Sequence, residues 1–235
     1  MLGLLVIIIV SWVLLRFIQR TDLEALGIIP NTKRLVQFSI GFAIITIISL
    51  LMIYIETIVL SVKWQFNQSI EYVSFLHAFI YHIKSALTED LVFRGAILYI
   101  LIQRIGTQKA LILSALFFGI YHVFSYGMLE SNLLLIVFII ITTGLTGYVW
   151  AYTFAKTNSI MMALGFHIGW NLVQTCFFKS QPYGELLFSE ISKIQLVDWD
   201  WLLFATFKGL LPSILTFFFV KQYLRKKAKI NKLKS

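Results

Sequence analysis

The sequence predicts an all-α fold, a polytopic transmembrane bundle of seven to eight helices that encloses an intramembrane polar cavity. Of its 235 residues, 59% are hydrophobic and only 13% are charged, whereas a soluble domain carries about 25% charged residues. Apolar runs of about 20 residues, the length that crosses a bilayer as a helix, recur along the chain. Some of these runs contain ionisable side chains, which are costly in lipid and therefore face the interior of a bundle.

Six apolar runs are long enough to be transmembrane helices. They lie at roughly 2–18, 35–61, 109–126, 132–155, 158–178 and 201–224. The first run has no basic residue ahead of its apolar core and no small-residue cleavage site after it. We therefore expect it to be a retained span rather than a signal peptide.

The segment 69–104 decides the number of crossings. As one helix it would be about 52 Å long, well beyond a hydrocarbon core of about 30 Å. We expect an interfacial or half-inserted helix near 70–86 and one net crossing, giving eight helices and seven crossings. One net crossing also satisfies the positive-inside rule, because it separates the acidic loop 179–200 from most basic residues. Those basic residues are Arg16, Arg20, Lys33, Arg34, Arg104, Lys109, Lys156 and the C-terminal tail.

The net charge of +9 is concentrated near the C-terminus, where residues 221–235 hold seven of the twenty Lys and Arg. We expect these residues to contact anionic lipid on the cytoplasmic side rather than nucleic acid. The chain is thus divided into one transmembrane domain, 1–224, with its motifs in 86–178, and a basic cytoplasmic tail, 225–235. The single cysteine, Cys176, excludes an internal disulfide and a cysteine-based zinc site.

The stretch "ALTEDLVFRGAILYI" (86–100) carries two adjacent acids and an arginine within an apolar run. Asp90 and Arg94 are four residues apart, so they share a helix face and can form an ion pair. Glu89 is rotated by about 100° from Asp90 and can point elsewhere, as a free carboxylate aimed into a cavity. The alternative is a packing network of all three residues that fixes the register of the helix.

A second polar pair lies in "MMALGFHIGWNLVQ". His167 and Asn171 are four residues apart, so both can donate hydrogen bonds toward one point. Gly165 and Gly169 flank the histidine at the small-xxx-small spacing that lets another helix approach closely. We expect this approach to bring His167 near side chains of other helices. The alternative is that Asn171 is only a polar clamp between helices.

A third apolar run, "ALFFGIYHVFSYG", carries His122 one turn after Phe118. Alone, such a histidine is more typical of a hydrogen-bonded core residue. Together, the three runs supply a carboxylate, two imidazoles, an amide and an ion pair. A carboxylate can act as general base toward water, and imidazole and amide donors can stabilise an oxyanion. This inventory can hydrolyse an amide. The chain has no H-E-x-x-H motif and no evident Ser-His-Asp arrangement.

The three motifs, in this order, resemble those of the CPBP family of intramembrane proteases. This is the CAAX protease and bacteriocin-processing group, also called Abi, which includes the type II CAAX prenyl endopeptidases (Ras-converting enzymes). The family pattern is E-E-x-x-x-R, then F-x-x-x-H, then H-x-x-x-N or H-x-x-x-B. Here the motifs read "EDLVFR" from Glu89, "FGIYH" from Phe118 and "HIGWN" from His167. The resemblance covers about 86–178.

The resemblance implies catalytic roles for four residues. Glu89, helped by His122, would activate the attacking water, and His167 with Asn171 would hold the oxyanion. The name metalloprotease is attached to the family, and Glu89, His122 and His167 could hold a divalent metal such as zinc with an open water position. The position of Asn171 beside His167 favours a donor pair and a metal-free mechanism, so we assign no metal ligands.

The resemblance also implies three supporting residues. Arg94 would orient the acids, and Phe118 would shape the pocket. Asp90 stands where the family has a second glutamate. Its arm is one methylene shorter, but it can still pair with Arg94.

We therefore expect an intramembrane endopeptidase acting on a membrane-associated peptide or protein, either CAAX-like or bacteriocin-like. A basic, Phe-rich chain of this compact size is typical of a bacterial cytoplasmic membrane protein. One alternative is a catalytically inactive membrane scaffold or bacteriocin self-immunity protein of the same fold, which the change at Asp90 favours. A transporter or proton carrier would predict inverted repeats or broken helices, and neither is visible in the sequence.

Three other ionisable residues in apolar runs are expected near membrane interfaces, where polar tips reach headgroups. His82 is expected on the interfacial helix. Glu56 is expected to reach water or Lys63, and Lys208 to extend outward toward the headgroups.

Overall fold

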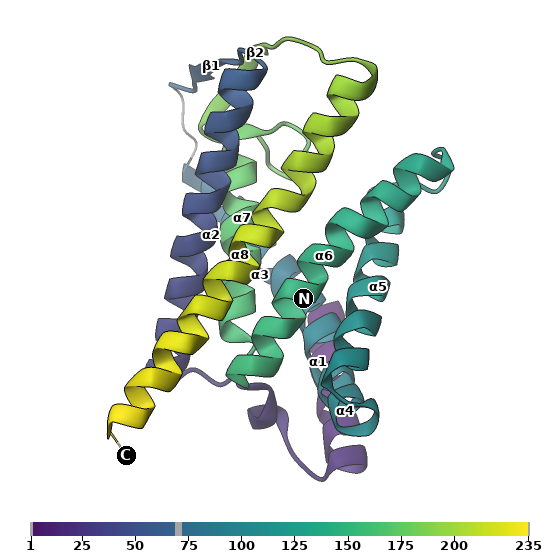
Figure 1. The fold of residues 1–235 in the computed structure, drawn as a ribbon, viewed down its shortest axis with the longest axis vertical. Helices are drawn as coiled ribbons and strands as arrows, with labels where there is room; N and C mark the ends of the chain where they lie inside the picture. The colour runs from purple at the N-terminus through teal and green to yellow at the C-terminus, as the bar shows by residue number, and fades with distance from the viewer. Residues whose placement is uncertain (1, 69–71, 235) are drawn as a thin grey trace.

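The computed structural model describes residues 2–68 and 72–234, which form eight α-helices and one two-stranded sheet (Figure 1). The helices are α1 (Leu2–Leu14), α2 (Thr32–Val59), α3 (Tyr72–Arg94), α4 (Ala96–Ile105), α5 (Thr107–Ser125), α6 (Leu133–Thr157), α7 (Met161–Phe177) and α8 (Asp198–Lys234). The short helical segments η1 (Leu15–Gln19) and η2 (Leu23–Leu26) follow α1, and β1 (Lys63–Phe66) pairs antiparallel with β2 (Phe188–Ser192). The predicted all-α bundle of seven to eight helices is confirmed.

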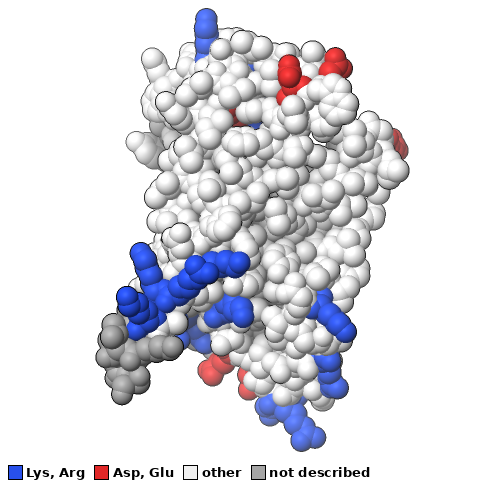
Figure 2. Space-filling view, viewed as in Figure 1, with Lys and Arg blue, Asp and Glu red and all other residues white. Residues whose placement is uncertain are grey.

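Within the described ranges, five helical segments are long and apolar enough to cross a membrane. They are Leu2–Gln19, Thr32–Val59, Thr107–Ser125, Leu133–Thr157 and Asp198–Lys229. Figure 2 shows a broad band without charged atoms between the two charged ends of the molecule. The protein is therefore an integral membrane protein. The segment 225–235, predicted as a tail, continues α8 as far as Lys234, and residue 235 lies outside the described residues.

The two ends of the bundle carry different structures. At one end, which we call the strand end, β1 pairs with β2 and joins the segment after α2 to the loop between α7 and α8. At the other end, Ile160 N donates a hydrogen bond to Leu26 O at 3.0 Å and Ser159 Oγ donates one to Gly27 O at 2.9 Å. Figure 2 shows most Lys and Arg, in blue, gathered at this second end, which we call the basic end. A single net crossing over 69–104 predicts that most basic residues lie at one end of the bundle, as they do here.

The segment 69–104 forms two helices, but the predicted position of the break is wrong. α3 continues through residue 86 to Arg94, and Gly95 separates it from α4. A Cβ at Gly95 would lie 2.0 Å from the backbone oxygen of Leu91, so the site requires glycine. Residues 70 and 71 of the predicted interfacial helix lie outside the described residues. The break therefore lies eight residues further along the chain than the sequence predicts.

α7 lies at the centre of the bundle and contributes side chains to both buried apolar clusters of the core. Its glycines let α2 approach closely, as predicted. A Cβ at Gly165 would lie 2.3 Å from a backbone oxygen of α2, and one at Gly169 would lie 2.5 Å from a side chain of α2. Gly41 of α2 meets the backbone of α7 in the same way, at 2.3 Å. This backbone-to-backbone packing holds the α7 turn that carries His167.

Replacing Gly165 by leucine is expected to lower the free energy of unfolding by about 3 kcal/mol, because overpacking forces the backbones of α2 and α7 apart. Thermal unfolding of the purified protein in detergent measures the change. Gly3→Leu is the matched control, because a Cβ at Gly3 meets nothing within 4 Å. Equal melting temperatures for the two variants would contradict the proposed packing role.

Candidate active site

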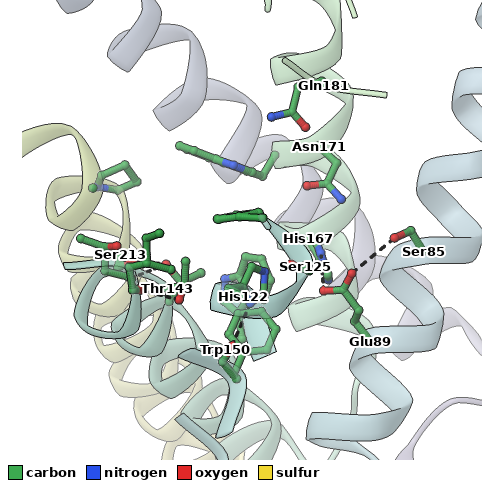
Figure 3. A pocket seen from close by; sticks show the side chains of 18 of the residues that line it. Ser85, Glu89, His122, Ser125, Thr143, Trp150, His167, Asn171, Gln181 and Ser213 are labelled. Atoms are coloured by element: carbon green, nitrogen blue, oxygen red, sulfur yellow. Dashed lines mark hydrogen bonds and ion pairs between the residues drawn. The ribbon is translucent and has the colours of Figure 1, made fainter. Parts of the chain in front are cut away.

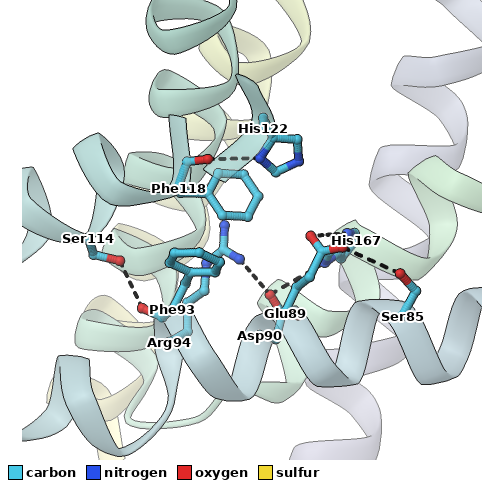
Figure 4. A network of polar contacts seen from close by, with 9 residues as sticks. All are labelled: Ser85, Glu89, Asp90, Phe93, Arg94, Ser114, Phe118, His122 and His167. Atoms are coloured by element: carbon cyan, nitrogen blue, oxygen red, sulfur yellow. Dashed lines mark hydrogen bonds and ion pairs between the residues drawn. The ribbon is translucent and has the colours of Figure 1, made fainter. Parts of the chain in front are cut away.

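Asp90 and Arg94 form the buried ion pair that their spacing predicts (Figure 4). Arg94 Nη1 lies 2.9 Å from Asp90 Oδ1, and both side chains are fully buried. The guanidinium carbon of Arg94 lies 4.0 Å from the ring centroid of Phe118 and 5.0 Å from that of Trp150. Both distances are in the range of cation–π contacts. Arg94 therefore ties α3 to both α5 and α6.

Glu89 points away from this pair and into a cavity (Figure 3). Its side chain is 16% exposed, and Oε1 accepts a hydrogen bond from Ser85 Oγ at 3.4 Å. Oε2 is buried and has no hydrogen-bond partner among the described residues. Glu89 therefore stays outside the Asp90–Arg94 pair, as predicted, and its carboxylate lines the cavity beside His167.

His167 of α7 lies between the two acids of α3 (Figure 4). Its Nε2 lies 3.8 Å from Glu89 Oε2, and its Nδ1 lies 3.5 Å from Asp90 Oδ1. The Trp150 ring packs against the imidazole with centroids 4.7 Å apart. The α2–α7 packing thus brings His167 to other functional side chains, as predicted. A protonated His167 would face a carboxylate from each ring nitrogen.

His122 lies at the C-terminal part of α5 and lines the same cavity. Its Nδ1 is 2.8 Å from the carbonyl oxygen of Phe118. A carbonyl only accepts hydrogen bonds, so Nδ1 carries the proton and Nε2 has a free lone pair. Asn171 also lines the cavity, one turn of α7 beyond His167 (Figure 3). All four predicted catalytic residues therefore border one space.

The cavity has a volume of about 880 Å³. Beyond the predicted residues, it is lined by aromatic rings and by a row of hydroxyl groups on α6 and α8. These residues include Tyr81, Tyr126, Trp150, Trp170, Thr142, Thr143, Thr146, Ser213 and Thr216. Single aromatic and hydroxyl residues are common in membrane helices, so no sequence signal distinguished them. Their mixture of apolar and hydrogen-bonding surface suits an extended peptide.

Five buried polar atoms beside the cavity have no hydrogen-bond partner among the described residues. They are Glu89 Oε2, Asp90 Oδ2, Arg94 Nε, Arg94 Nη2 and His167 Nδ1. Buried polar atoms in native proteins are nearly always satisfied, by protein or by ordered water. Of these residues, Glu89 and His167 line the cavity, whereas Asp90 and Arg94 do not.

A metal site does not match the arrangement of these donors. In the part of the chain that the structure describes, no three His, Cys, Asp or Glu side chains are grouped so that they could hold a metal ion. Glu89 and His167 are a pair at 3.8 Å, and His122 does not join them in such a group. Catalytic zinc takes three protein ligands, so no step proposed below uses a metal.

The expected interfacial position of His82 is wrong. The side chain is 2% exposed, and its Nε2 lies 2.6 Å from Thr175 Oγ1 and 3.3 Å from the carbonyl oxygen of Pro182. His82 therefore connects α3 to α7 and to the loop that follows α7. It also lines the cavity.

The expectations for Glu56 and Lys208 are also wrong, because these residues pair with each other. Lys208 Nζ lies 2.5 Å from Glu56 Oε2, and the Glu56 side chain is 6% exposed. The ammonium also lies 4.7 Å from the ring centroid of Phe178. This ion pair joins α2 to α8 near the strand end and borders the cavity through Lys208.

Comparison with protein families gave a match over the middle of the chain. The model of the family described as "Rce1-like: Type II CAAX prenyl endopeptidase Rce1-like" matches residues 71–173. The family resemblance is therefore confirmed. The matched segment contains all three motifs, from Glu89 to Asn171, and the family is one of peptidases. Comparison with curated proteins and with solved structures found no match.

Proposed function

We propose that the protein is an intramembrane endopeptidase that hydrolyses a peptide bond of a membrane-associated peptide. The observation that carries this proposal is the position of Glu89. Glu89 lines a large cavity together with His122 and Asn171, and its Oε2 lies 3.8 Å from His167 Nε2. The match of this segment to an Rce1-like endopeptidase family supports the same activity.

In the proposed reaction, Glu89 takes a proton from a water molecule as the oxygen attacks the peptide carbonyl. The lone pair of His122 Nε2 accepts the water's other hydrogen and so helps to orient it. His167 Nε2–H and the Asn171 amide donate to the oxyanion of the tetrahedral intermediate. Glu89 then gives its proton to the leaving amine, and the C–N bond breaks.

Asp90 and Arg94 act in this proposal as positioning residues. Asp90 Oδ1 lies 3.5 Å from His167 Nδ1 and 2.9 Å from Arg94 Nη1. With a proton on both ring nitrogens, His167 directs Nδ1–H toward Asp90 and keeps Nε2–H for the oxyanion. Arg94 holds the Asp90 carboxylate in place through their buried ion pair.

The substrate is proposed to be a CAAX-like or bacteriocin-like membrane peptide. The protein is proposed to reside in a bacterial cytoplasmic membrane, with the basic end in the cytoplasm and in contact with anionic lipid. The only support for a prenylated substrate is the name of the matched family. In bacteria, maturation of a bacteriocin or of another membrane peptide is the better candidate.

Peptide cleavage by the purified protein in liposomes tests the proposal. The panel contains membrane-anchored peptides with and without a prenyl group, each incubated with wild type and His167→Ala, with and without a strong chelator. We expect the wild type to cleave at least one peptide and His167→Ala to cleave it about 100-fold more slowly or worse. We expect the chelator to leave the cleavage rate unchanged. Loss of cleavage with the chelator, restored by zinc, would overturn the metal-free mechanism.

The inactive scaffold or self-immunity protein is the alternative function, because Asp90 departs from the family pattern. The contact of Asp90 with Arg94 at 2.9 Å weakens this argument, since the shorter acid still makes the pair. A Glu89→Gln variant with its full biological effect in cells would favour the scaffold. A transporter would predict an inverted repeat as well as a broken helix beside the site, and the sequence shows no such repeat.

A further inference from the structure

The cavity extends from Glu89 to the strand end of the molecule. Three consecutive residues of the loop between α7 and α8, Ser180, Gln181 and Pro182, line it. Tyr126, which follows α5 at the same end, lines it too and is 58% exposed. Figure 3 shows Gln181 beyond Asn171 on the side away from Trp150. The mouth of the cavity is therefore at the strand end.

The cavity is closed toward the basic end. Arg94, about one turn beyond Glu89 toward the basic end, is fully buried. Phe118, one turn before His122 on the same side, is 2% exposed and packs against Arg94. Thr146 and Ser213 share a hydrogen bond of 2.7 Å that joins α6 to α8, and Thr216 below them is 1% exposed. None of the lining residues belongs to the segments 20–31 or 157–160, which meet at the basic end.

The charges of the two ends differ in sign. The segments at the strand end carry more acids than bases, with Glu130, Glu185, Glu190, Asp198 and Asp200 against Lys63, Lys179 and Lys193. The segments at the basic end carry many more bases than acids, including Arg16, Arg20, Lys33, Arg34, Arg104, Lys109, Lys156 and the basic part of α8. The positive-inside rule places the basic end in the cytoplasm.

We propose that the cavity takes its substrate from the non-cytoplasmic side of the membrane, so that the substrate class is an exported or outer-leaflet membrane peptide. The substrate class in this inference rests on the proposed peptidase activity. The direction of the mouth does not depend on that activity. It excludes a prenylated protein terminus presented from the cytoplasm. The only cation among the described lining residues, Lys208, is already paired with Glu56, so the mouth suits an uncharged, partly apolar segment.

The direction of the mouth is tested by thiol labelling in a Cys176→Ser background, the chain having one cysteine. Ser180→Cys probes the mouth, and Ser85→Cys, beside Glu89, probes the depth of the cavity. Thr107→Cys is the control, because it is exposed and follows α4, which packs on η1 and η2 at the basic end. Each variant is treated with a small membrane-impermeant thiol reagent in right-side-out and in inverted vesicles of a bacterial membrane.

We expect Ser180→Cys and Ser85→Cys to react at least about tenfold faster in right-side-out vesicles, and Thr107→Cys at least about tenfold faster in inverted vesicles. Reaction of Ser85→Cys from the same side as Thr107→Cys, or from neither side, would overturn the proposal. This readout does not depend on catalysis, so it decides the direction of the mouth even if no peptide is cleaved.

A second experiment tests from which side of the membrane the peptide reaches the active site. A peptide that the wild type cleaves in detergent is added outside vesicles of each orientation, with Glu89→Gln vesicles as the blank. Cleavage in right-side-out vesicles supports the inference. Cleavage only in inverted vesicles overturns it while leaving the proposed peptidase in place. Failure to find any cleaved peptide counts against the peptidase, and the labelling result then stands alone.

Discussion

Glu89→Gln is expected to lower kcat/KM for peptide cleavage by about 100-fold to 10,000-fold, the usual contribution of a general base. The amide keeps the size of the side chain but cannot take a proton from water. The Glu89 carboxylate lines the cavity, and its Oε2 makes no hydrogen bond, while Oε1 accepts one from Ser85. The measurement is cleavage of a membrane-anchored peptide by purified variants at equal concentration.

Glu24→Gln is the matched control for this variant, because it makes the same chemical change at an exposed position of η2 near the basic end. Both variants should show the melting temperature of the wild type to within a few degrees. If Glu89→Gln retains activity within threefold of the control, the general base is another group and the assignment fails.

Arg94→Ala is expected to lower the free energy of unfolding by about 3–5 kcal/mol, the cost of removing one partner of a buried ion pair. The variant leaves the Asp90 carboxylate without its ion-pair partner in a fully buried place and removes the group that packs against Phe118 and Trp150. Denaturant or thermal unfolding in detergent measures the change. Arg225→Ala, at an exposed position of α8, is the control.

The double variant Asp90→Asn with Arg94→Gln separates charge from packing. Replacing both partners leaves no isolated buried charge, so the double variant should be more stable than Arg94→Ala alone. A loss below about 1 kcal/mol for Arg94→Ala would show that the pair is not structural, and the role of Arg94 in holding Asp90 would have to be abandoned.

The features that could be predicted from the sequence are those set by local spacing. The ion pair of Asp90 with Arg94 follows from their four-residue separation on one helix, and the apolar runs gave the helices. The close approach at Gly165 follows from its spacing to Gly169, although the sequence did not identify α2 as the partner. Each of these signals lies within a single helix.

The features that the sequence missed depend on partners far along the chain. The sequence predicts an interfacial His82 because nothing in it indicates the contact with Pro182, 100 residues away. Glu56 and Lys208 are 152 residues apart, and each alone is typical of a residue near a helix end. A glycine in an apolar helix, such as Gly95, more often serves packing than a break, so the position of the break needed the structure.

The break at Gly95 also has an electrostatic consequence. It makes Arg94 the last residue of α3, so that a helix terminus lies inside the protein beside the site. The last carbonyl groups of a helix have no partner within it and carry the partial negative charge of the helix dipole. One of them, Phe93 O, accepts a hydrogen bond from Ser114 Oγ at 2.8 Å (Figure 4). The helix dipole therefore adds to Asp90 and the aromatic rings in stabilising the buried positive charge of Arg94, and an unbroken helix at this position would lack that contribution.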